Sequence, residues 1–144
     1  MIVTSERTYH EKLGLAVGAM MTSDAYCRYP VACLTEWVKP AILLDQIHFF
    51  FDRTGHLGGY LTWAFLAKDT EERLVGDPRV LLHLSEWNEG DRLWFMDMVV
   101  INTEVRRYLS HARIKLFPGV REAFSLRRRG DGSVRKVVKW RGSH

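Results

Sequence analysis

Residues 86–97 have the sequence EWNEGDRLWFMD, in which a polar turn leads into aromatic and apolar residues that contain one carboxylate. Bulky apolar residues of this kind predict a strand over 93–100. Burying an ionised Asp97 beside Phe95 and Met96 is costly unless a partner binds the carboxylate. We therefore take Asp97 as a candidate site residue. Two alternatives are open: pleat alternation directs Asp97 to a solvent-facing side of the strand, or the carboxylate makes a purely structural hydrogen bond.

The segments around this strand predict one domain in the order helices, strands, helices, strands. The expected helices are residues 6–21, residues 32–44 with a kink or break at Pro40, one or two short pieces within 69–84 broken near Gly76-Asp77-Pro78, and residues 103–116 capped by Asn102. The expected strands are residues 47–52, 60–66, 93–100, 122–128 and 134–140, with hairpin turns at 54–59 and 130–132. Helices packed on a mainly antiparallel sheet make this an α+β fold class.

Five short segments occur in an order and spacing that are hard to obtain by chance. They are TSDAYCRYPV at 22–31, KPAI at 39–42, GYLTWA at 59–64, GDRLWFMD at 90–97 and FPGVR at 117–121. Together they resemble the RTX toxin-activating lysine acyltransferases, the HlyC-type proteins that fatty-acylate a protoxin, and the likeness covers nearly the whole chain.

The resemblance implies a GNAT-like acyltransferase fold, an acyl carrier protein (ACP) as the donor, a lysine of an RTX protoxin-like protein or peptide as the acceptor, and a homodimer. It implies no cofactor besides the acyl-ACP donor. The residues support a protein-borne donor independently. The chain passes from Val99-Val100-Ile101 into Asn102-Thr103 without glycine, whereas a loop that cradles the pyrophosphate of coenzyme A needs close backbone approach and free amides.

Two positions differ from the family pattern. The catalytic His of the family lies four residues before a Pro, and the matching position here is Tyr26, whereas the catalytic Asp matches Asp97. Trp37 takes the place of a family Asn. A phenol with a pKa of about 10 is a poor base at neutral pH but can serve as an acid or as a hydrogen-bond donor. We expect Tyr26 to be the donor and Asp97 or a water the base; the alternatives are a packing role for Tyr26 and a degenerate domain that only binds a carrier or another partner.

Other candidates are weaker. Cys27 becomes a possible nucleophile if the match shifts by one residue, and Ser23 matches a family Ser beside the site, although a buried thiol and a capping hydroxyl are ordinary alternatives. His48 and His111 qualify as bases only if the fold brings them to the site. The expected substrate-binding residues are Trp63, on a strand that the resemblance places along the acyl groove, together with Trp37, Arg92 and Arg121.

Composition and charge restrict the location and the partners. The two cysteines are six residues apart without a CxxC motif or a nearby His, so we expect no metal site. The apolar run 13–21 is too short to span a bilayer, and we expect a cytoplasmic protein. Residues 117–144 hold eight Lys and Arg against two acidic residues, or about +6 (8 minus 2), within a total of +4. This basic region suits an acidic protein, an anionic membrane or, with Phe124 and Trp140 for stacking, a nucleic acid; a solvated edge hairpin explains it equally well.

Overall fold

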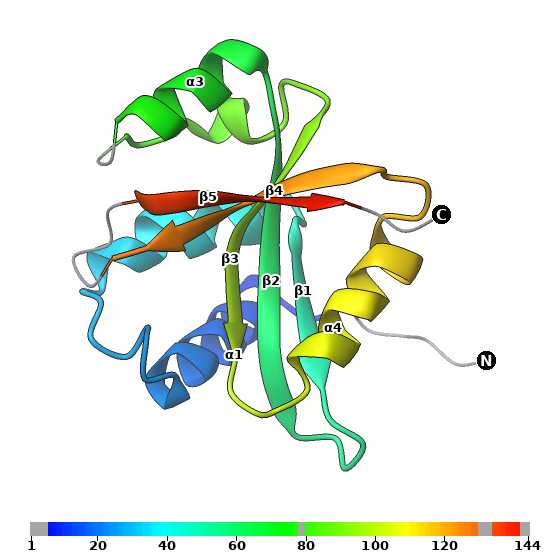
Figure 1. The fold of residues 1–144 in the computed structure, drawn as a ribbon. Helices are drawn as coiled ribbons and strands as arrows, with labels where there is room; N and C mark the ends of the chain where they lie inside the picture. The colour runs from blue at the N-terminus through cyan, green and yellow to red at the C-terminus, as the bar shows by residue number, and fades with distance from the viewer. Residues whose placement is uncertain (1–5, 78–79, 130–133, 142–144) are drawn as a thin grey trace.

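A five-stranded sheet forms the centre of the protein, whose computed structural model describes residues 6–77, 80–129 and 134–141. Its strands lie in sequence order and are β1 (Ile47–Phe51), β2 (Leu57–Leu66), β3 (Arg92–Val100), β4 (Glu122–Arg128) and β5 (Val134–Arg141). All neighbouring strands are antiparallel except β3 and β4, which run parallel on either side of a helical connection. Figure 1 shows β4 and β5 crossing β3 at a steep angle. This α+β arrangement agrees with the expected GNAT-like fold.

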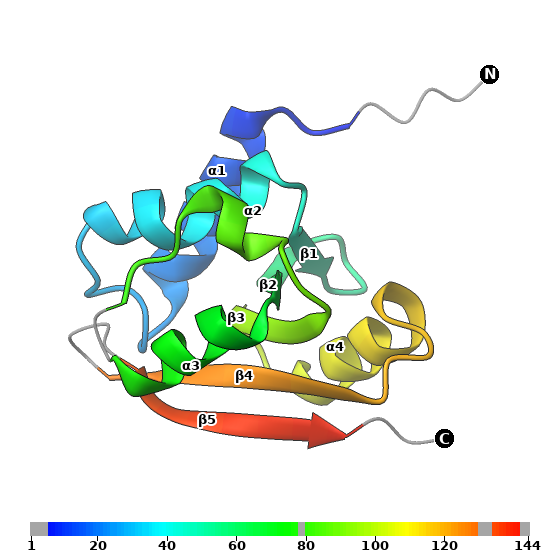
Figure 2. The same cartoon turned by 90° about the horizontal axis from the view of Figure 1, so that it is seen from above.

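Two helical layers cover opposite faces of the sheet, as Figure 2 shows. The first face, here called the α1 face, packs against α1 (Tyr9–Thr22) and α2 (Lys39–Leu43) through a core that includes Ala16, Ala19, Val38 and Ala41. The second, the α4 face, packs against α4 (Val105–His111) through Tyr108 and Ala112. Thr8 and Glu11 form a capping box at the start of α1, which fixes where this helix begins.

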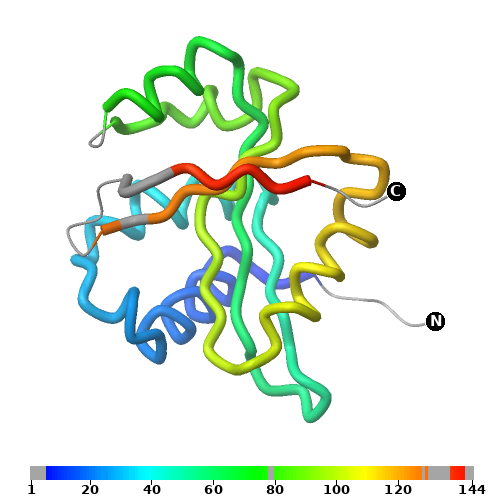
Figure 3. The backbone as a smooth tube through the Cα atoms, viewed as in Figure 1, coloured from blue at the N-terminus to red at the C-terminus, as the bar shows by residue number. Residues whose placement is uncertain are grey.

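The predicted break at Pro40 takes the form of a π-helical turn. The turn η1 (Leu34–Val38) precedes α2, and the backbone N–H of Lys39 donates to the carbonyl of Leu34. Because proline has no N–H and its ring crowds the preceding turn, a widened turn lets the helix continue. The backbone tube in Figure 3 follows this segment from the end of α1 into β1.

The helix α3 (Lys68–Gly76) ends at the predicted break, and the next helical piece is a 3₁₀ turn, η2 (Leu84–Trp87), which begins at the last residue of the predicted range 69–84. One helical prediction needs correction. Asn102 does not cap the next helix directly, since the N-cap of α4 is Glu104, whose backbone N–H donates to the Asn102 side-chain oxygen. The Asn102 amide also donates to the hydroxyl of Tyr108, so this residue ties the end of β3 to α4. The helix continues through a π-helical turn, η3 (Ala112–Leu116).

The other predicted elements are confirmed within a few residues, except for the turn at 130–132, which lies outside the described residues. Gly90, in the opening motif, is required by close packing rather than by backbone angle. A Cβ atom at this position would overlap the carbonyl of Leu66, where β2 ends beside the turn that enters β3. The glycine therefore lets two chain segments meet at the start of the central strand.

A β-bulge interrupts the pairing of β2 with β3 at the opening motif. Thr62 pairs with Asp97 and Trp63 pairs with Phe95, so Met96 is an extra residue in β3. Trp94, Met96 and Val99 pack on the α1 face, whereas Leu93, Phe95, Met98 and Val100 pack on the α4 face. The alternation therefore changes phase at Met96 and Asp97. With regular alternation through Met96, Asp97 would lie on the α4 face with Phe95.

Candidate active site

Tyr26 and Asp97, which are 71 residues apart, meet on the α1 face. The Tyr26 hydroxyl donates to Oδ1 of Asp97 at 2.8 Å, and Asp97 is 4% exposed while Tyr26 is half-buried. Tyr26 lies in the turn segment that follows α1, and Asp97 lies in the bulged part of β3. The alternative in which Asp97 faces solvent is therefore wrong. The cost of burying Asp97 is lowered by a hydrogen bond from Tyr26, the other residue that the family resemblance singled out.

Thr62 fixes the backbone of Asp97. Its hydroxyl oxygen accepts the backbone N–H of Asp97 at 3.0 Å, and Thr62 is fully buried. A bulge leaves strand groups without their usual ladder partners, so a side-chain acceptor at this point lets Asp97 be buried without an unpaired amide. The bulge and the threonine together direct the carboxylate toward Tyr26.

An aromatic series supports the Tyr26 segment. The ring of Tyr26 contacts Tyr29 edge-on, with centroids 5.2 Å apart, and Tyr29 contacts Trp37 in the same way. The Tyr29 hydroxyl donates to the carbonyl of Arg129 at 2.9 Å, which connects the segment to the end of β4. Trp37 is thus placed two rings away from Asp97 and buttresses the loop that carries Tyr26.

Ser23 and Cys27 lie in the same loop in secondary positions. The Ser23 hydroxyl accepts the backbone N–H of Tyr26 at 3.3 Å, which is the capping arrangement that was the alternative to a role in the site. Cys27 is exposed, and its Sγ atom lies 3.8 Å from the carbonyl oxygen of Asp24. The interpretation of Cys27 as a buried core residue is therefore wrong.

The structure does not bring the histidines to this site. His48 and His111 stack on each other on the α4 face, with centroids 5.2 Å apart and an interplanar angle of 23°. Burial, and to a smaller degree the charge of His111, lowers the pKa of His48 from its ordinary value of 6.5. Both rings are separated from Tyr26 by the sheet, so neither is in place to act as a base on a group bound at Asp97.

The other predicted binding residues are also dispersed. Trp63 lies on the α4 face and contacts the ring of Phe117 edge-on at 5.1 Å. Arg92 pairs with Glu71 of α3 and lies over the ring of Phe124, so its side chain links the start of β3 to α3 and β4. Arg121 is exposed in the segment that leads into β4.

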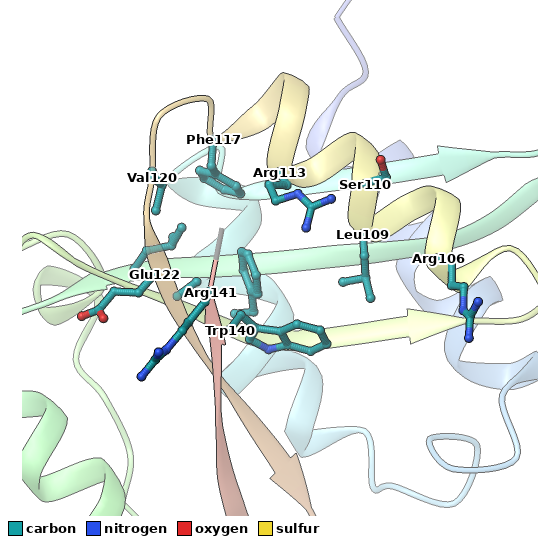
Figure 4. A pocket seen from close by; sticks show the side chains of 12 residues that line it. Arg106, Leu109, Ser110, Arg113, Phe117, Val120, Glu122, Trp140 and Arg141 are labelled. Atoms are coloured by element: carbon teal, nitrogen blue, oxygen red, sulfur yellow. The ribbon is translucent and has the colours of Figure 1, made fainter. Parts of the chain in front are cut away.

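A pocket that the sequence reasoning missed opens on the α4 face. It has a volume of about 220 Å³ and is lined from α4, η3, β3, β4 and β5 (Figure 4). Four of its lining residues, Arg106, Leu109, Ser110 and Arg113, recur at helical spacing and could have been recognised as one face of a helix. The strand residue Trp140 on the other side gives no comparable signal.

Elsewhere the described residues offer few other candidate sites. Within residues 6–77, 80–129 and 134–141, no group of three or more His, Cys, Asp or Glu side chains is arranged to hold a metal ion. In the same residues no helix has the length and apolar character needed to cross a membrane.

Comparisons with known proteins identify the family of this chain. Residues 5–141 match the model of the RTX toxin acyltransferase family. The chain is 26% identical over 136 residues to the RTX-II toxin-activating lysine-acyltransferase ApxIIC of Actinobacillus pleuropneumoniae, which covers 88% of this chain and 84% of that protein. It is 30% identical over 106 residues to the protein-lysine myristoyltransferase RtxC of Kingella kingae, covering 74% of this chain and 62% of that protein. Over nearly its whole length, this chain belongs to the RTX toxin acyltransferase family.

Proposed function

We propose that the protein transfers a fatty acyl group from the thioester of an acyl carrier protein to a lysine amine of a protein or peptide acceptor of the RTX protoxin kind. The observation that supports this most directly is the 2.8 Å hydrogen bond between Tyr26 and the buried Asp97. Acyl transfer to an amine needs a base for the ammonium proton and a donor for the oxyanion or thiolate, and a carboxylate and a phenol in contact can supply these two roles. The names of the two relatives, a lysine-acyltransferase and a lysine myristoyltransferase, support the reaction class.

The reaction forms a C–N bond between the lysine nitrogen and the acyl carbon, and it breaks the C–S bond of the thioester. The lysine ammonium must lose two protons in total: one reaches the departing thiolate and the other reaches solvent. Asp97 binds the ammonium and accepts its proton, directly or through a water. Tyr26 then donates its hydroxyl hydrogen bond to the developing oxyanion or thiolate, and Asp97 keeps the phenol oriented until substrate arrives.

The donor proposal has two supports. The chain from Val99 to Thr103 contains no glycine, which disfavours a coenzyme A pyrophosphate loop at the end of β3. The excess of positive charge from Phe117 onward suits an acidic carrier. We further propose that the active form is a homodimer in the cytoplasm and needs no cofactor besides the acyl-ACP donor. Light scattering at several protein concentrations tests the dimer.

The test of function is intact-mass spectrometry of the protein with a panel of acyl-ACP thioesters and a lysine-containing acceptor peptide. We expect amide formation by the native protein, a loss of about 10²-fold or more in Asp97→Asn and in Tyr26→Phe, and little change in Cys27→Ala. Tyr29→Phe is the matched control, because it removes a phenol from the same loop whose hydroxyl bonds the Arg129 carbonyl. Equal activity in native protein and Asp97→Asn would end the proposal.

A second candidate function is a binding domain that holds an acyl carrier or another partner without turnover. Tyr26 at the position that the resemblance assigns to the catalytic His, and Trp37 at the position of the family Asn, favour it. Carrier binding with no thioester consumption above background would establish this function. Accumulation of an acylated Cys27 would instead indicate a covalent route through the exposed thiol.

A further inference from the structure

The pocket on the α4 face has an apolar interior and a basic rim. Side chains of Leu93, Phe95, Leu109, Phe117, Val120 and Trp140 contribute to its lining. Figure 4 shows Leu109 and Trp140 on opposite sides of the opening, with Phe117 and Val120 at one end. The ring of Phe117 in turn contacts the ring of Trp63 edge-on at 5.1 Å, so aromatic side chains back this end of the pocket. Such a lining favours hydrocarbon over polar ligands.

The charges at the rim are unbalanced. Arg106 projects from α4, Arg113 from η3 and Arg141 from β5, and all three contribute to the lining. Glu122 is the single acidic residue of the lining, and its carboxylate already pairs with Lys139 at 3.1 Å. The rim is therefore positive around an apolar interior. This combination is complementary to an amphiphile that has a hydrocarbon tail and an anionic group.

The shape restricts the ligand further. At about 220 Å³ the pocket is smaller than the roughly 300–1,000 Å³ of sites for drug-sized ligands, so it suits one narrow chain rather than a two-chain lipid. Phe95 of its lining is two residues from Asp97, about 7 Å along the strand but on the opposite face of the sheet. In the described chain, the pairing of β3 with β4 comprises Trp94–Phe124 and Phe95–Ser125 and ends there. The pocket thus lies beside the point where the two strands part.

We propose that this pocket binds one long aliphatic chain that carries an anionic group, with the chain against Leu109, Val120 and Trp140 and the anion at the arginines. A free fatty carboxylate and the acyl phosphopantetheine of a carrier share this chemistry. In the second case the inference rests on the proposed function and assigns the pocket to the acyl donor. Binding itself does not depend on transfer.

The experiment uses a fatty carboxylate brominated on its chain, which quenches tryptophan fluorescence on contact. We expect saturable quenching that is largely lost in Trp140→Phe. Val120→Phe fills the pocket and should weaken binding by about fourfold for each methylene displaced, or roughly 15-fold for two. Ile114→Phe is the matched control, because Ile114 is 57% exposed on η3 and does not line the pocket; it should bind normally. The methyl ester should bind roughly two- to fivefold more weakly than the carboxylate, and Arg113→Gln should remove this difference.

Two outcomes would overturn the proposal: quenching that persists undiminished in Trp140→Phe, or affinities of Val120→Phe that match those of native protein. A transfer assay across acyl chain lengths separates the two sources of ligand. If Val120→Phe shifts the preferred chain length downward and Ile114→Phe does not, the occupant is the donor chain. If binding falls while chain-length preference is unchanged, the occupant is a free fatty carboxylate. Because the quenching uses a ligand that cannot be transferred, it remains informative even if the protein proves inactive.

Discussion

The hydrogen bond between Tyr26 and Asp97 should be a measurable part of the folding energy. Its acceptor is a carboxylate that is 4% exposed, and its length is 2.8 Å. Hydrogen bonds to charged groups contribute about 1.5–3 kcal/mol net, and we take a value near the middle of that range. Tyr26→Phe removes the hydroxyl but keeps the ring that contacts Tyr29. The expected loss is therefore about 2 kcal/mol.

The expected decrease in melting temperature follows from this loss and the unfolding entropy of the protein. Unfolding entropy is about 2.1 cal/mol/K per residue, or about 0.3 kcal/mol/K for 144 residues, so 2 kcal/mol corresponds to a decrease of about 7 °C. Calorimetry and urea unfolding of Tyr26→Phe, Asp97→Asn and the double variant form a cycle that isolates the interaction. We expect a coupling of about 1–2 kcal/mol, with the double variant less destabilised than the sum of the single variants.

The matched cycle replaces Tyr26→Phe by Tyr29→Phe. The Tyr29 hydroxyl donates to a backbone carbonyl, so its loss should add to that of Asp97→Asn within about 0.5 kcal/mol. Equal coupling in both cycles, or a Tyr26–Asp97 coupling below about 0.5 kcal/mol, would refute the argument that this specific bond compensates the burial of Asp97.

Three further predictions concern the surroundings of the site. Thr62→Val should cost about 1–3 kcal/mol in urea unfolding, because it leaves the buried N–H of Asp97 without its hydroxyl acceptor; a loss below about 0.5 kcal/mol would contradict that role. Because the pKa of His48 is lowered in the folded protein, the unfolded chain binds this proton more readily, and stability should fall as the pH drops below about 6.5. Melting temperatures measured between about pH 5 and 8 should show this dependence, and His48→Phe should flatten it. Gly90→Ala should destabilise the protein by about 1–3 kcal/mol, since its Cβ would overlap the backbone of Leu66; unchanged thermal unfolding would show that the two segments can separate without cost.

Most of the fold could be predicted because its signals are local. The apolar and β-branched runs gave the five strands, and helical spacing gave α1 and the segment around Pro40. The misses occur where tertiary contacts decide the outcome. Asn102 has a side chain suited to capping, but its two hydrogen bonds are to the Glu104 amide and the Tyr108 hydroxyl, which moves the start of α4 by two residues.

The candidate site was predictable in part, through the resemblance rather than through residue patterns. That likeness singled out Tyr26 and Asp97, and the structure brings them into contact. The bulge at Met96 could not be anticipated, because every residue from Leu93 to Val100 except Asp97 is apolar. In such a run the sequence looks the same whichever face of the sheet each side chain points to, so a shift in the alternation leaves no trace. The pocket was missed for another reason. The sequence of α4 shows which of its residues share a helix face, but it does not show that a space remains between that face and the strands opposite.

The position of the loop after α1 explains why the residue at position 26 can be a tyrosine. The turn after α1 holds this residue beside the sheet, and the phenol reaches Asp97 through the outermost atom of its side chain. An imidazole places its nitrogens closer to the backbone than a phenol places its hydroxyl. A histidine in the same backbone position would therefore fall short of the carboxylate unless the loop moved inward or a water filled the gap. Tyr29 and Trp37 resist such a movement, since their edge-on ring contacts support the loop. The loop, its aromatic support and the tyrosine thus form one consistent arrangement, in which direct contact with Asp97 requires the longer side chain.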